Sequence, residues 1–267
     1  MKISIVTINY NDRNGLERTI KSVLDQTFQS FEYIVIDGGS NDGSRELLQE
    51  HTNKFDYWVS EPDNGIYNAM NKGLEHVTGD YVLFLNSGDR LFAQDILEKV
   101  SKTGLEADFN YGDLEMEDEH GSWIKKYPDE LTTKYLVNAA LPHQGLFIKK
   151  EVFDQYGGYN ENYKIVSDWL HYAELFVQKK ATFKRIPFTV SIFDRSGISS
   201  SSAHQELHDK ERQEVLQMLF SEELLALIKE NNQLKVENGR LKRLLQSRTV
   251  RLALKITGKK LEKGKFI

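Results

Sequence analysis

The chain has 267 residues, 39% of them hydrophobic, a formal net charge of −5 and no cysteine. This length predicts one large domain, or one domain with an appendage, that buries a core of its own. The lack of cysteine excludes disulfides, cysteine-bound zinc, thiolate catalysis and iron–sulfur clusters, and it fits a reducing compartment. The net acidity argues against a nucleic-acid-binding protein.

The first hundred residues alternate apolar, β-branched runs with amphipathic stretches. Strands are expected at residues 3–8, 31–36, 55–59 and 81–85, and each is followed by a helical or turn-rich segment. The first helix is the clearest, because Asp12 can cap it and Leu16, Ile20 and Val23 repeat at helical spacing. Short connections between such elements predict βαβ units, so the fold class is α/β with a mostly parallel sheet flanked by helices.

The pattern changes after about residue 105. Residues 109–116 and 122–127 surround a turn at His120-Gly121 and predict a hairpin. A helix near 131–137, a strand near 145–148, a helix near 168–177 and short strands near Phe183 and Val190 follow. No apolar run is long enough to span a bilayer, and the apolar start is too short for a signal peptide, so we expect a cytoplasmic protein.

Heptad spacing marks the C-terminal segment. Leucine or asparagine occupies Leu224, Asn231, Asn238 and Leu245, and leucine occupies Leu227, Leu234 and Leu241. Asparagine at two core positions is typical of a register-fixing coiled coil and predicts a homodimer or higher oligomer through residues 224–245. The alternative is a single amphipathic helix folded on its own domain.

The charge is distributed unevenly along the chain. From Lys229 to the end there are 12 Lys and Arg against 3 Asp and Glu, whereas the rest has 23 against 37. The basic tail interleaves Val250, Leu252, Leu254 and Ile256, a composition that suits an anionic membrane surface. A solvated tail is the alternative, so the protein is expected in the cytoplasm, either free or peripheral at the inner face of the cell membrane.

Polar residues follow each of the first four predicted strands, where an open α/β sheet binds its ligands. These ends carry Asn9 to Asn11, Asp37 with its glycine-rich loop, Glu61 to Gly65, and Asn86 to Asp89. A dinucleotide fingerprint and a P-loop are both missing. Because carboxylates repel bare phosphates, an acidic crevice predicts a pyrophosphate bridged by Mg²⁺ or Mn²⁺.

Several segments in order resemble glycosyltransferase family 2. They are residues 4–11 (SIVTINYN), 22–28 (SVLDQTF), 36–44 (IDGGSNDGS), 60–67 (SEPDNGIY) and 79–81 (GDY). The resemblance covers about residues 1–200 and is greatest to the bacterial branch that builds surface polysaccharides. It implies a GT-A fold and an inverting transfer of a sugar from a nucleotide diphosphate sugar to a hydroxyl.

The resemblance also predicts the domain organisation. Residues 1–202 would form the glycosyltransferase domain, with a nucleotide-sugar half at 1–104 and an acceptor half at 105–202. A helix or coiled coil would follow at 203–247, and a basic tail at 248–267.

The resemblance also implies roles for individual residues. The nucleotide-sugar site would comprise Thr7, the Ile8 backbone, Tyr10, Asp37, Asp63, Asn71, Asn86 and Ser87. For Asp63, helix capping is the alternative. The second acid of the strand-two loop is replaced by Gly38, which weakens the inference of a UDP-sugar. UDP-sugar remains the first expectation, with GDP- and dTDP-sugars as alternatives.

The metal and the base follow from the same resemblance. The metal-binding D-x-D element reads Asn86-Ser87-Gly88, so Asp89 just after it is expected to be the main carboxylate for Mn²⁺ or Mg²⁺. Asp168 matches the general base, with an N-cap as its alternative role. His143, Gln144 and Trp169 would contact the acceptor or the diphosphate. The acceptor would be a glycan or a lipid-linked oligosaccharide.

Two competing functions remain open from the sequence. The loss of the D-x-D acids allows a non-catalytic scaffold that organises partner enzymes through its coiled coil, although Asp168 and Asp89 argue against it. A sugar nucleotidyltransferase is the other, but the glycine-rich, basic N-terminal loop of that class is missing.

Overall fold

The structure is a computed structural model that describes residues 1–195, 202–246, 261–262 and 265–266. The chain forms two compact units, Met1–Val215 and Leu216–Ile267. The sequence predicts a domain boundary at residue 202, whereas the first unit extends to Val215. The first unit is longer because it includes most of helix α8 (Ser202–Leu219).

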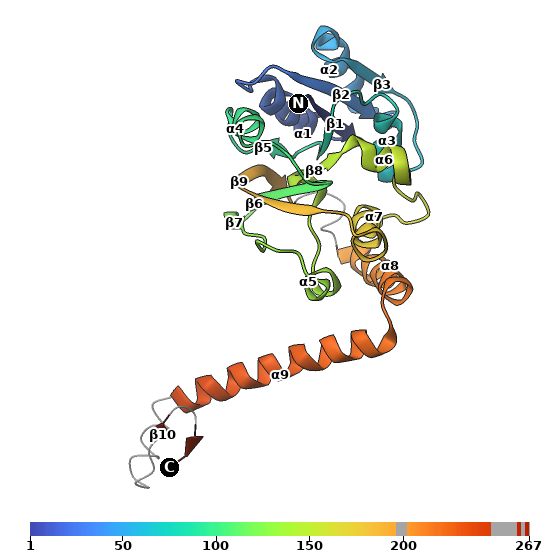
Figure 1. The fold of residues 1–267 in the computed structure, drawn as a ribbon. Helices are drawn as coiled ribbons and strands as arrows, with labels where there is room; N and C mark the ends of the chain where they lie inside the picture. The colour runs from blue at the N-terminus through green and yellow to red at the C-terminus, as the bar shows by residue number, and fades with distance from the viewer. Residues whose placement is uncertain (196–201, 247–260, 263–264, 267) are drawn as a thin grey trace. The chain divides into compact units, whose positions relative to one another are not determined.

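A single sheet organises the first unit (Figure 1). Its strand order is β3-β2-β1-β4-β8-β6-β9-β5, and β7 pairs with β6 at the side. The strands are β1 (Ile3–Asn9), β2 (Phe31–Asp37), β3 (Tyr57–Ser60), β4 (Tyr81–Asn86), β5 (Arg90–Leu91), β6 (Phe109–Asp118), β7 (Gly121–Lys125), β8 (Leu146–Lys149) and β9 (Phe183–Asp194).

The first four strands are parallel, as expected, but the sheet as a whole is mixed. Strand β8 runs antiparallel to both β4 and β6, whereas β6 and β9 are parallel. The two short strands expected near Phe183 and Val190 are one strand, β9, whose pairing with β6 shifts in register around Asp113. This irregularity interrupts the regular alternation of side chains along the pair. The sequence pattern therefore predicts two short strands where the structure has one.

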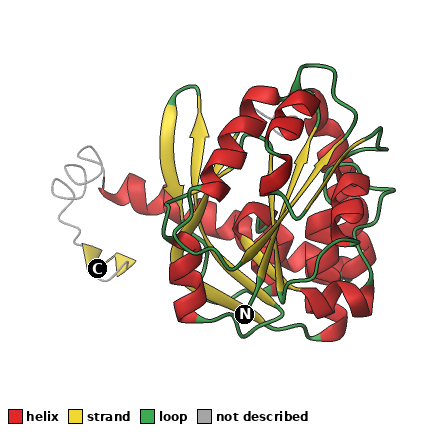
Figure 2. Ribbon diagram, turned by 90° about the horizontal axis from the view of Figure 1, so that it is seen from above, coloured by secondary structure: helices red, strands yellow, loops and turns green. Residues whose placement is uncertain are grey.

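Helices cover both faces of the sheet (Figure 2). They are α1 (Arg13–Leu24), α2 (Ser44–Glu50), α3 (Ile66–Leu74), α4 (Ile96–Thr103), α5 (Thr133–Asn138), α6 (Lys150–Tyr156) and α7 (Ser167–Glu174). Short turns η1 (Thr52–Lys54) and η2 (His143–Gly145) and a π-helical extension of α7, η3 (Leu175–Lys179), complete the unit. The sequence analysis does not predict strand β5 or helices α4 and α6.

The core explains this two-sided arrangement. Strand β1 is buried along its whole length, so successive side chains face opposite helical layers. Leu16, Ile20 and Val23 of α1 join Ile3 and Ile5 in one cluster. On the other face α3 approaches so closely that a Cβ at Gly73 would lie 2.5 Å from Val6 Cγ1, which only glycine permits.

The segment expected as one helix or coiled coil at 203–247 is two helices, α8 and α9 (Glu222–Gln246). The heptad leucines Leu227, Leu234 and Leu241 on α9 are 62%, 49% and 53% exposed. Such a leucine stripe fits a coiled-coil seam, and dimerisation stays a prediction. The predicted basic tail, 248–267, lies almost wholly outside the described residues. Among the helices that the structure describes, none is long and apolar enough to cross a membrane.

Candidate active site

The carboxyl ends of β1 to β4 form what we call the donor edge. Parallel pairing places Asn9 beside Asp37, and Asp37 beside Ser60, so three polar residues are adjacent although they are far apart in sequence. Asn9 Nδ2 and Ser40 Oγ donate to Asp37 Oδ1 at 2.6 and 2.5 Å. Ser60 Oγ and Ser40 N donate to Oδ2 at 2.6 and 3.0 Å.

Asp37 is fully buried, and both of its oxygens are occupied by these donors. A carboxylate accepts about four hydrogen bonds, so none remains for a ribose or base in this arrangement. Asp37 therefore holds the loops after β1, β2 and β3 together, which makes it a positioning residue for the donor edge.

The outer rim of the donor edge is formed by Tyr10, Gly38 and Asp63. Tyr10 is 60% exposed. A Cβ at Gly38 would lie 2.4 Å from Asp63 Oδ2 and 3.2 Å from Tyr10 Cδ2, so the three residues are in contact range. A side chain at position 38 would therefore have to displace the Asp63 carboxylate. Asp63 Oδ1 accepts from Gly65 N at 2.8 Å, and Gly65 is the N-cap residue of α3, so Asp63 also supports the start of that helix.

Three of the expected nucleotide residues are engaged inside the protein. Thr7 is buried, with its hydroxyl 3.2 Å from Tyr33 Oη, and the Ile8 carbonyl accepts from Ser87 N at 2.9 Å. The Asn71 amide donates to Tyr159 O and accepts from Tyr159 N, both at 2.8 Å. The groups named here are bonded within the protein, whereas Tyr10 and Asp63 belong to the outer rim.

The turn after β4 replaces the D-x-D element. Gly88 adopts φ +94°, and a Cβ there would lie 3.1 Å from Asp194 Oδ2, so an aspartate at this position would be strained and would crowd Asp194. Thr19 of α1 fixes the turn, because its hydroxyl donates to Asp89 O at 2.6 Å and accepts from Gly88 N at 3.0 Å. Asn86 Oδ1 is buried and has no hydrogen-bond partner among the described residues.

Asp89 is buried below this turn. Its carboxylate accepts from Asp194 N at 3.1 Å and from Asn86 N at 3.2 Å. Burial raises the pKa of Asp89 to about 7, although the nearby His143 charge and a hydrogen bond from Gln144 oppose the shift. A bound cation would favour the ionised form. Asp194, at the end of β9, was not predicted as a site residue, and it pairs with Arg18 at 3.0 Å.

The structure tests whether these residues suit a metal ion. In the described part of the chain no three His, Asp or Glu side chains are grouped as a metal site. Asn86 Oδ1 and the Asp89 carboxylate nevertheless belong to one turn, and both are oxygen ligands of the kind that Mg²⁺ takes. Mg²⁺ commonly draws its other ligands from substrate phosphates and water. The residues fit a cation held jointly with a diphosphate, and they do not form a complete site of their own.

Asp168 lies at the start of α7, where it meets His143 and Tyr67. Asp168 Oδ2 is 3.0 Å from His143 Nδ1, and Asp168 Oδ1 accepts from Tyr67 Oη at 3.0 Å and from its neighbour Trp169 N at 2.8 Å. The N-cap of α7 is Val166, so the alternative capping role of Asp168 is wrong. Burial and the adjacent Asp168 carboxylate raise the pKa of Tyr67, which keeps its hydroxyl a donor.

His143 connects Asp168 to the turn after β4. The exposed side-chain fractions of Asp168 and His143 are 19% and 11%, so the pair is largely shielded. His143 Nε2 and Gln144 Oε1 are buried without a partner among the described residues, as is Asn86 Oδ1. Buried polar atoms of this kind are costly unless a ligand or water satisfies them. These three atoms belong to residues near Asp89, where the donor edge meets α7.

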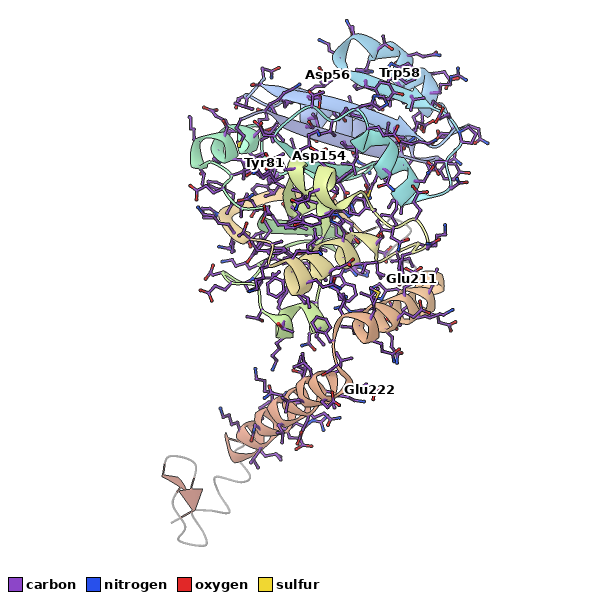
Figure 3. The ribbon with its side chains drawn as sticks, turned by 45° about the vertical axis from the view of Figure 1, so that its right-hand side comes forward. Asp56, Trp58, Tyr81, Asp154, Glu211 and Glu222 are labelled. Atoms are coloured by element: carbon purple, nitrogen blue, oxygen red, sulfur yellow. The ribbon has the colours of Figure 1, made fainter. Side chains whose placement is uncertain are left out.

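Helix α8 supports α7 from outside. Glu211, labelled in Figure 3, accepts from Lys164 N at 2.7 Å, Ile165 N at 2.9 Å and Val166 N at 3.3 Å. The Arg212 guanidinium lies 4.3 Å from the Trp169 ring centre, and Trp169 is 2% exposed. Trp169 is therefore a core residue between α7 and α8 and presents no surface to an acceptor. We call α7 and the residues held against it (His143, Tyr67, Glu211, Arg212) the acceptor side.

Comparison with known proteins shows to which family the chain belongs. The sequence model described as Glycosyl transferase family 2 matches residues 4–148. The chain belongs to this family. An uncharacterised glycosyltransferase of Mycobacterium tuberculosis is 36% identical over 174 residues, which is 62% of this chain and 65% of that protein. TuaG of Bacillus subtilis, provisionally named a teichuronic acid biosynthesis glycosyltransferase, is 34% identical over 139 residues, 49% of this chain and 54% of that one. The chain thus spans about two thirds of the length of the first relative and about half of the second.

Solved structures confirm the expected GT-A fold. S. aureus TarS 1–349 in complex with UDP-GlcNAc has a TM-score of 0.65 at 17% identity, covering 85% of this chain and 70% of that chain. A Pyrobaculum calidifontis mannosyltransferase in complex with GDP-mannose and Mn²⁺ has a TM-score of 0.54 at 15% identity, with coverages of 72% and 56%. At these identities the likeness establishes the fold alone.

Proposed function

We propose that this protein transfers a sugar, with inversion, from a nucleotide diphosphate sugar to a hydroxyl of a glycan or lipid-linked acceptor in the synthesis of a bacterial surface polysaccharide. The observation that carries the proposal is the Asp168–His143 pair, a shielded carboxylate and imidazole 3.0 Å apart where the donor edge meets α7. Family membership and a relative named for teichuronic acid synthesis support the reaction and its setting.

In this proposal Asp168 removes the proton of the acceptor hydroxyl. The hydroxyl oxygen forms a bond to the anomeric carbon from the face opposite the diphosphate. The bond from that carbon to the diphosphate oxygen breaks, and the nucleoside diphosphate leaves with the electron pair. Tyr67 and His143 orient the Asp168 carboxylate, and proton removal during the attack lowers the barrier.

Other residues would hold the donor. Tyr10 offers an exposed ring for the base, and Asp63 lies beside it. Asn86 and Ser87 would lie beside the diphosphate, and Asn86 Oδ1 with the Asp89 carboxylate below the turn would supply the protein's oxygen ligands for Mn²⁺ or Mg²⁺. When bound, the cation neutralises charge that develops on the leaving diphosphate. UDP-sugar is the first candidate donor, since a protein of this fold binds UDP-GlcNAc, and GDP-sugar is the second, since another binds GDP-mannose.

The test is thermal unfolding with UDP, GDP, dTDP and CMP, each with and without Mn²⁺, followed by donor consumption assays with the nucleotide that binds. A ligand at about 100 times its Kd stabilises by about 2.7 kcal/mol, which raises the midpoint by several degrees in a domain of this size. We expect one nucleotide to stand out, and more so with Mn²⁺. No shift with any nucleotide, and no consumption of any donor sugar, would favour the scaffold alternative.

A further inference from the structure

Arg212 of α8 holds the C-terminal end of α5. Its Nη2 donates to the carbonyls of Leu136, Val137 and Ala139 at 3.1, 3.3 and 3.2 Å. The last carbonyls of a helix have no partner inside that helix, so a side chain or water must satisfy them. Helix α5 has only six residues, too few to be stable without tertiary contacts. Arg212 therefore fixes the place where α5 ends.

The short segment after α5, residues 139–142, leads directly to His143. Arg212 holds the carbonyl at its start. Tyr172 of α7 holds its middle, because Tyr172 Oη accepts from Leu141 N at 2.6 Å. Since the segment is short and is fixed at two points, the residue that follows it has little freedom. The position of His143 thus depends on the two side chains that hold this segment.

Arg212 also contacts the helix that carries Asp168. Its guanidinium stacks on Trp169, the residue after Asp168, at 4.3 Å from the ring centre. The guanidinium is withdrawn from water, and this burial lowers the pKa of Arg212. A buried charge is costly unless its donors are used, and the carbonyls at the end of α5 use them. One side chain therefore joins the element that leads to His143 to the element that bears Asp168.

The neighbouring Glu211 acts at a different place. It accepts from the backbone nitrogens of residues 164–166, ahead of α7. The contacts of Arg212 with α5 and Trp169 do not pass through that segment. Two adjacent residues of α8 thus hold the acceptor side independently, and only Arg212 reaches the segment before His143.

We propose that Arg212 is a positioning residue, which sets the 3.0 Å approach of His143 Nδ1 to Asp168 Oδ2 by tying the end of α5 to α7. The inference rests on the proposed function, because it concerns the same base. It makes α8 necessary for the reaction although α8 contributes no group to it. A misplacement of about 1 Å by a distant substitution can cost about 100-fold in rate.

Two variants and one control test this role in the full chain. Arg212→Met keeps an unbranched side chain against Trp169 and removes every donor. Arg212→Lys keeps the charge on a shorter side chain. The control, Lys210→Met, removes an exposed cation from the same helix that makes no printed contact with α5. Far-UV circular dichroism and its thermal midpoint show which of these proteins are folded.

The readout of position is the NMR spectrum of the His143 ring. Its ¹⁵N shifts, detected through the carbon-bound ring protons of histidine-labelled protein, report the hydrogen bond at Nδ1. His143→Gln identifies the signal, and Asp168→Asn shows where it lies when the carboxylate is absent. The kcat for sugar transfer and the KM for the donor sugar are measured on the same proteins.

We expect the His143 shifts to move toward those of Asp168→Asn in Arg212→Met, to move less in Arg212→Lys, and to stay in place in Lys210→Met. In Arg212→Met kcat should fall by about 10- to 100-fold with little change in the KM for the donor. His143 shifts that stay in place in a folded Arg212→Met would overturn the proposal, even if kcat falls, because that loss would not come from the pair. If Arg212→Met does not fold, Arg212→Lys decides by the same comparison.

Failure of the proposed function gives a different pattern. In that case the unsubstituted chain consumes no donor sugar and no nucleotide shifts its unfolding midpoint. The His143 shifts still show whether Arg212 sets the geometry of the pair, because they are measured without substrate.

Discussion

The donor edge and the acceptor side are built by different means. At the donor edge, parallel register aligns Asn9, Asp37 and Ser60, and backbone pairing along β1, β2 and β3 maintains that alignment. On the acceptor side, single side chains connect distant segments, as when Tyr67 and His143 meet Asp168 or Glu211 meets residues 164–166. We therefore expect the loss of one side chain to disturb the acceptor side more than the donor edge.

The largest expected effect is on the acceptor side, at Asp168. Asp168→Asn keeps the shape of the side chain and removes the base, and general bases contribute about 10²–10⁴-fold to rate. We expect kcat for sugar transfer to fall by that factor while the nucleotide-induced shift of the unfolding midpoint is unchanged. Turnover close to that of the unsubstituted chain would refute the assignment of Asp168.

His143→Gln is the companion variant to Asp168→Asn. It keeps a polar side chain of similar reach next to Asp168. If His143 only orients the carboxylate, kcat falls less than in Asp168→Asn. An equal or larger loss would instead make the imidazole the group that takes the proton.

Acid should also destabilise the acceptor side, through His171 of α7. Burial lowers the pKa of His171 to about 4, while His in an unfolded chain titrates near 6.5. Between these values the unfolded state binds a proton that the folded state does not, so stability falls as pH decreases through this window. This difference in pKa should make the free energy of unfolding roughly 3 kcal/mol lower at pH 4 than at pH 7.

His171→Gln tests this titration, because glutamine can keep the hydrogen bond to Gly157 O, which lies 3.1 Å from His171 Nε2. Urea unfolding at a series of pH values gives the free energy of unfolding for both proteins. We expect the curve of the variant to be flatter between pH 6.5 and pH 4. Parallel curves would show that His171 does not carry the acid sensitivity.

Glu211→Gln should disturb α7 through the segment before it. The amide group that replaces one carboxylate oxygen faces backbone N–H donors, and an unsatisfied buried donor costs about 1–3 kcal/mol. The unfolding midpoint should fall by several degrees, since about 1 kcal/mol moves it roughly 2–4 °C at this size. We also expect kcat to fall with little change in the KM for the donor sugar, since Glu211 bonds to the backbone of residues 164–166 and not to the strand ends of the donor edge.

The control for Glu211→Gln is Glu206→Gln, an exposed position on the same helix. Exposed substitutions of this kind change stability by less than about 0.5 kcal/mol. If both variants behave alike, or if Glu211→Gln raises KM for the donor and leaves kcat unchanged, then Glu211 does not position α7.

At the donor edge the expected effect is smaller. Tyr10 is 60% exposed, so Tyr10→Ala should leave the unfolding midpoint of the free protein unchanged. Stacking of a base on an aromatic ring contributes about 1–3 kcal/mol, so nucleotide affinity should fall roughly ten-fold or more. Titration calorimetry measures this affinity, and Tyr10→Phe, which keeps the ring, should bind almost normally. Unchanged affinity in Tyr10→Ala would place the nucleotide elsewhere, and equal weakening in both variants would mean that the hydroxyl, and not the ring, makes the contact.

The two regions also differ in how far the sequence predicts them. Strands 3–8, 31–36 and 81–85 and the polar residues that follow them are local patterns, and parallel register then brings these ends together. Nothing in the pattern around Glu211 and Arg212 distinguishes them from the charged face of a helix, so α8 was assigned to the C-terminal extension. Asp194 and the internal bonding of Asp37 and Asn71 depend on contacts between distant segments, which periodicity does not contain.

The smallest expected effect on the site comes from the second unit. Leu227, Leu234 and Leu241 are exposed on α9, and two protomers that pack these leucines together would remove them from water. Deleting residues 222–267 should lower the mass measured by light scattering to that of a monomer. The nucleotide-induced shift of the unfolding midpoint should be unchanged, because the donor edge lies wholly within Met1–Val215.

The triple variant Leu227→Ala, Leu234→Ala and Leu241→Ala separates the effect of the leucine stripe from that of the basic tail, since it keeps every charge. An oligomer that survives this variant and the deletion would exclude the coiled coil, and a lost nucleotide response would make the second unit part of the site.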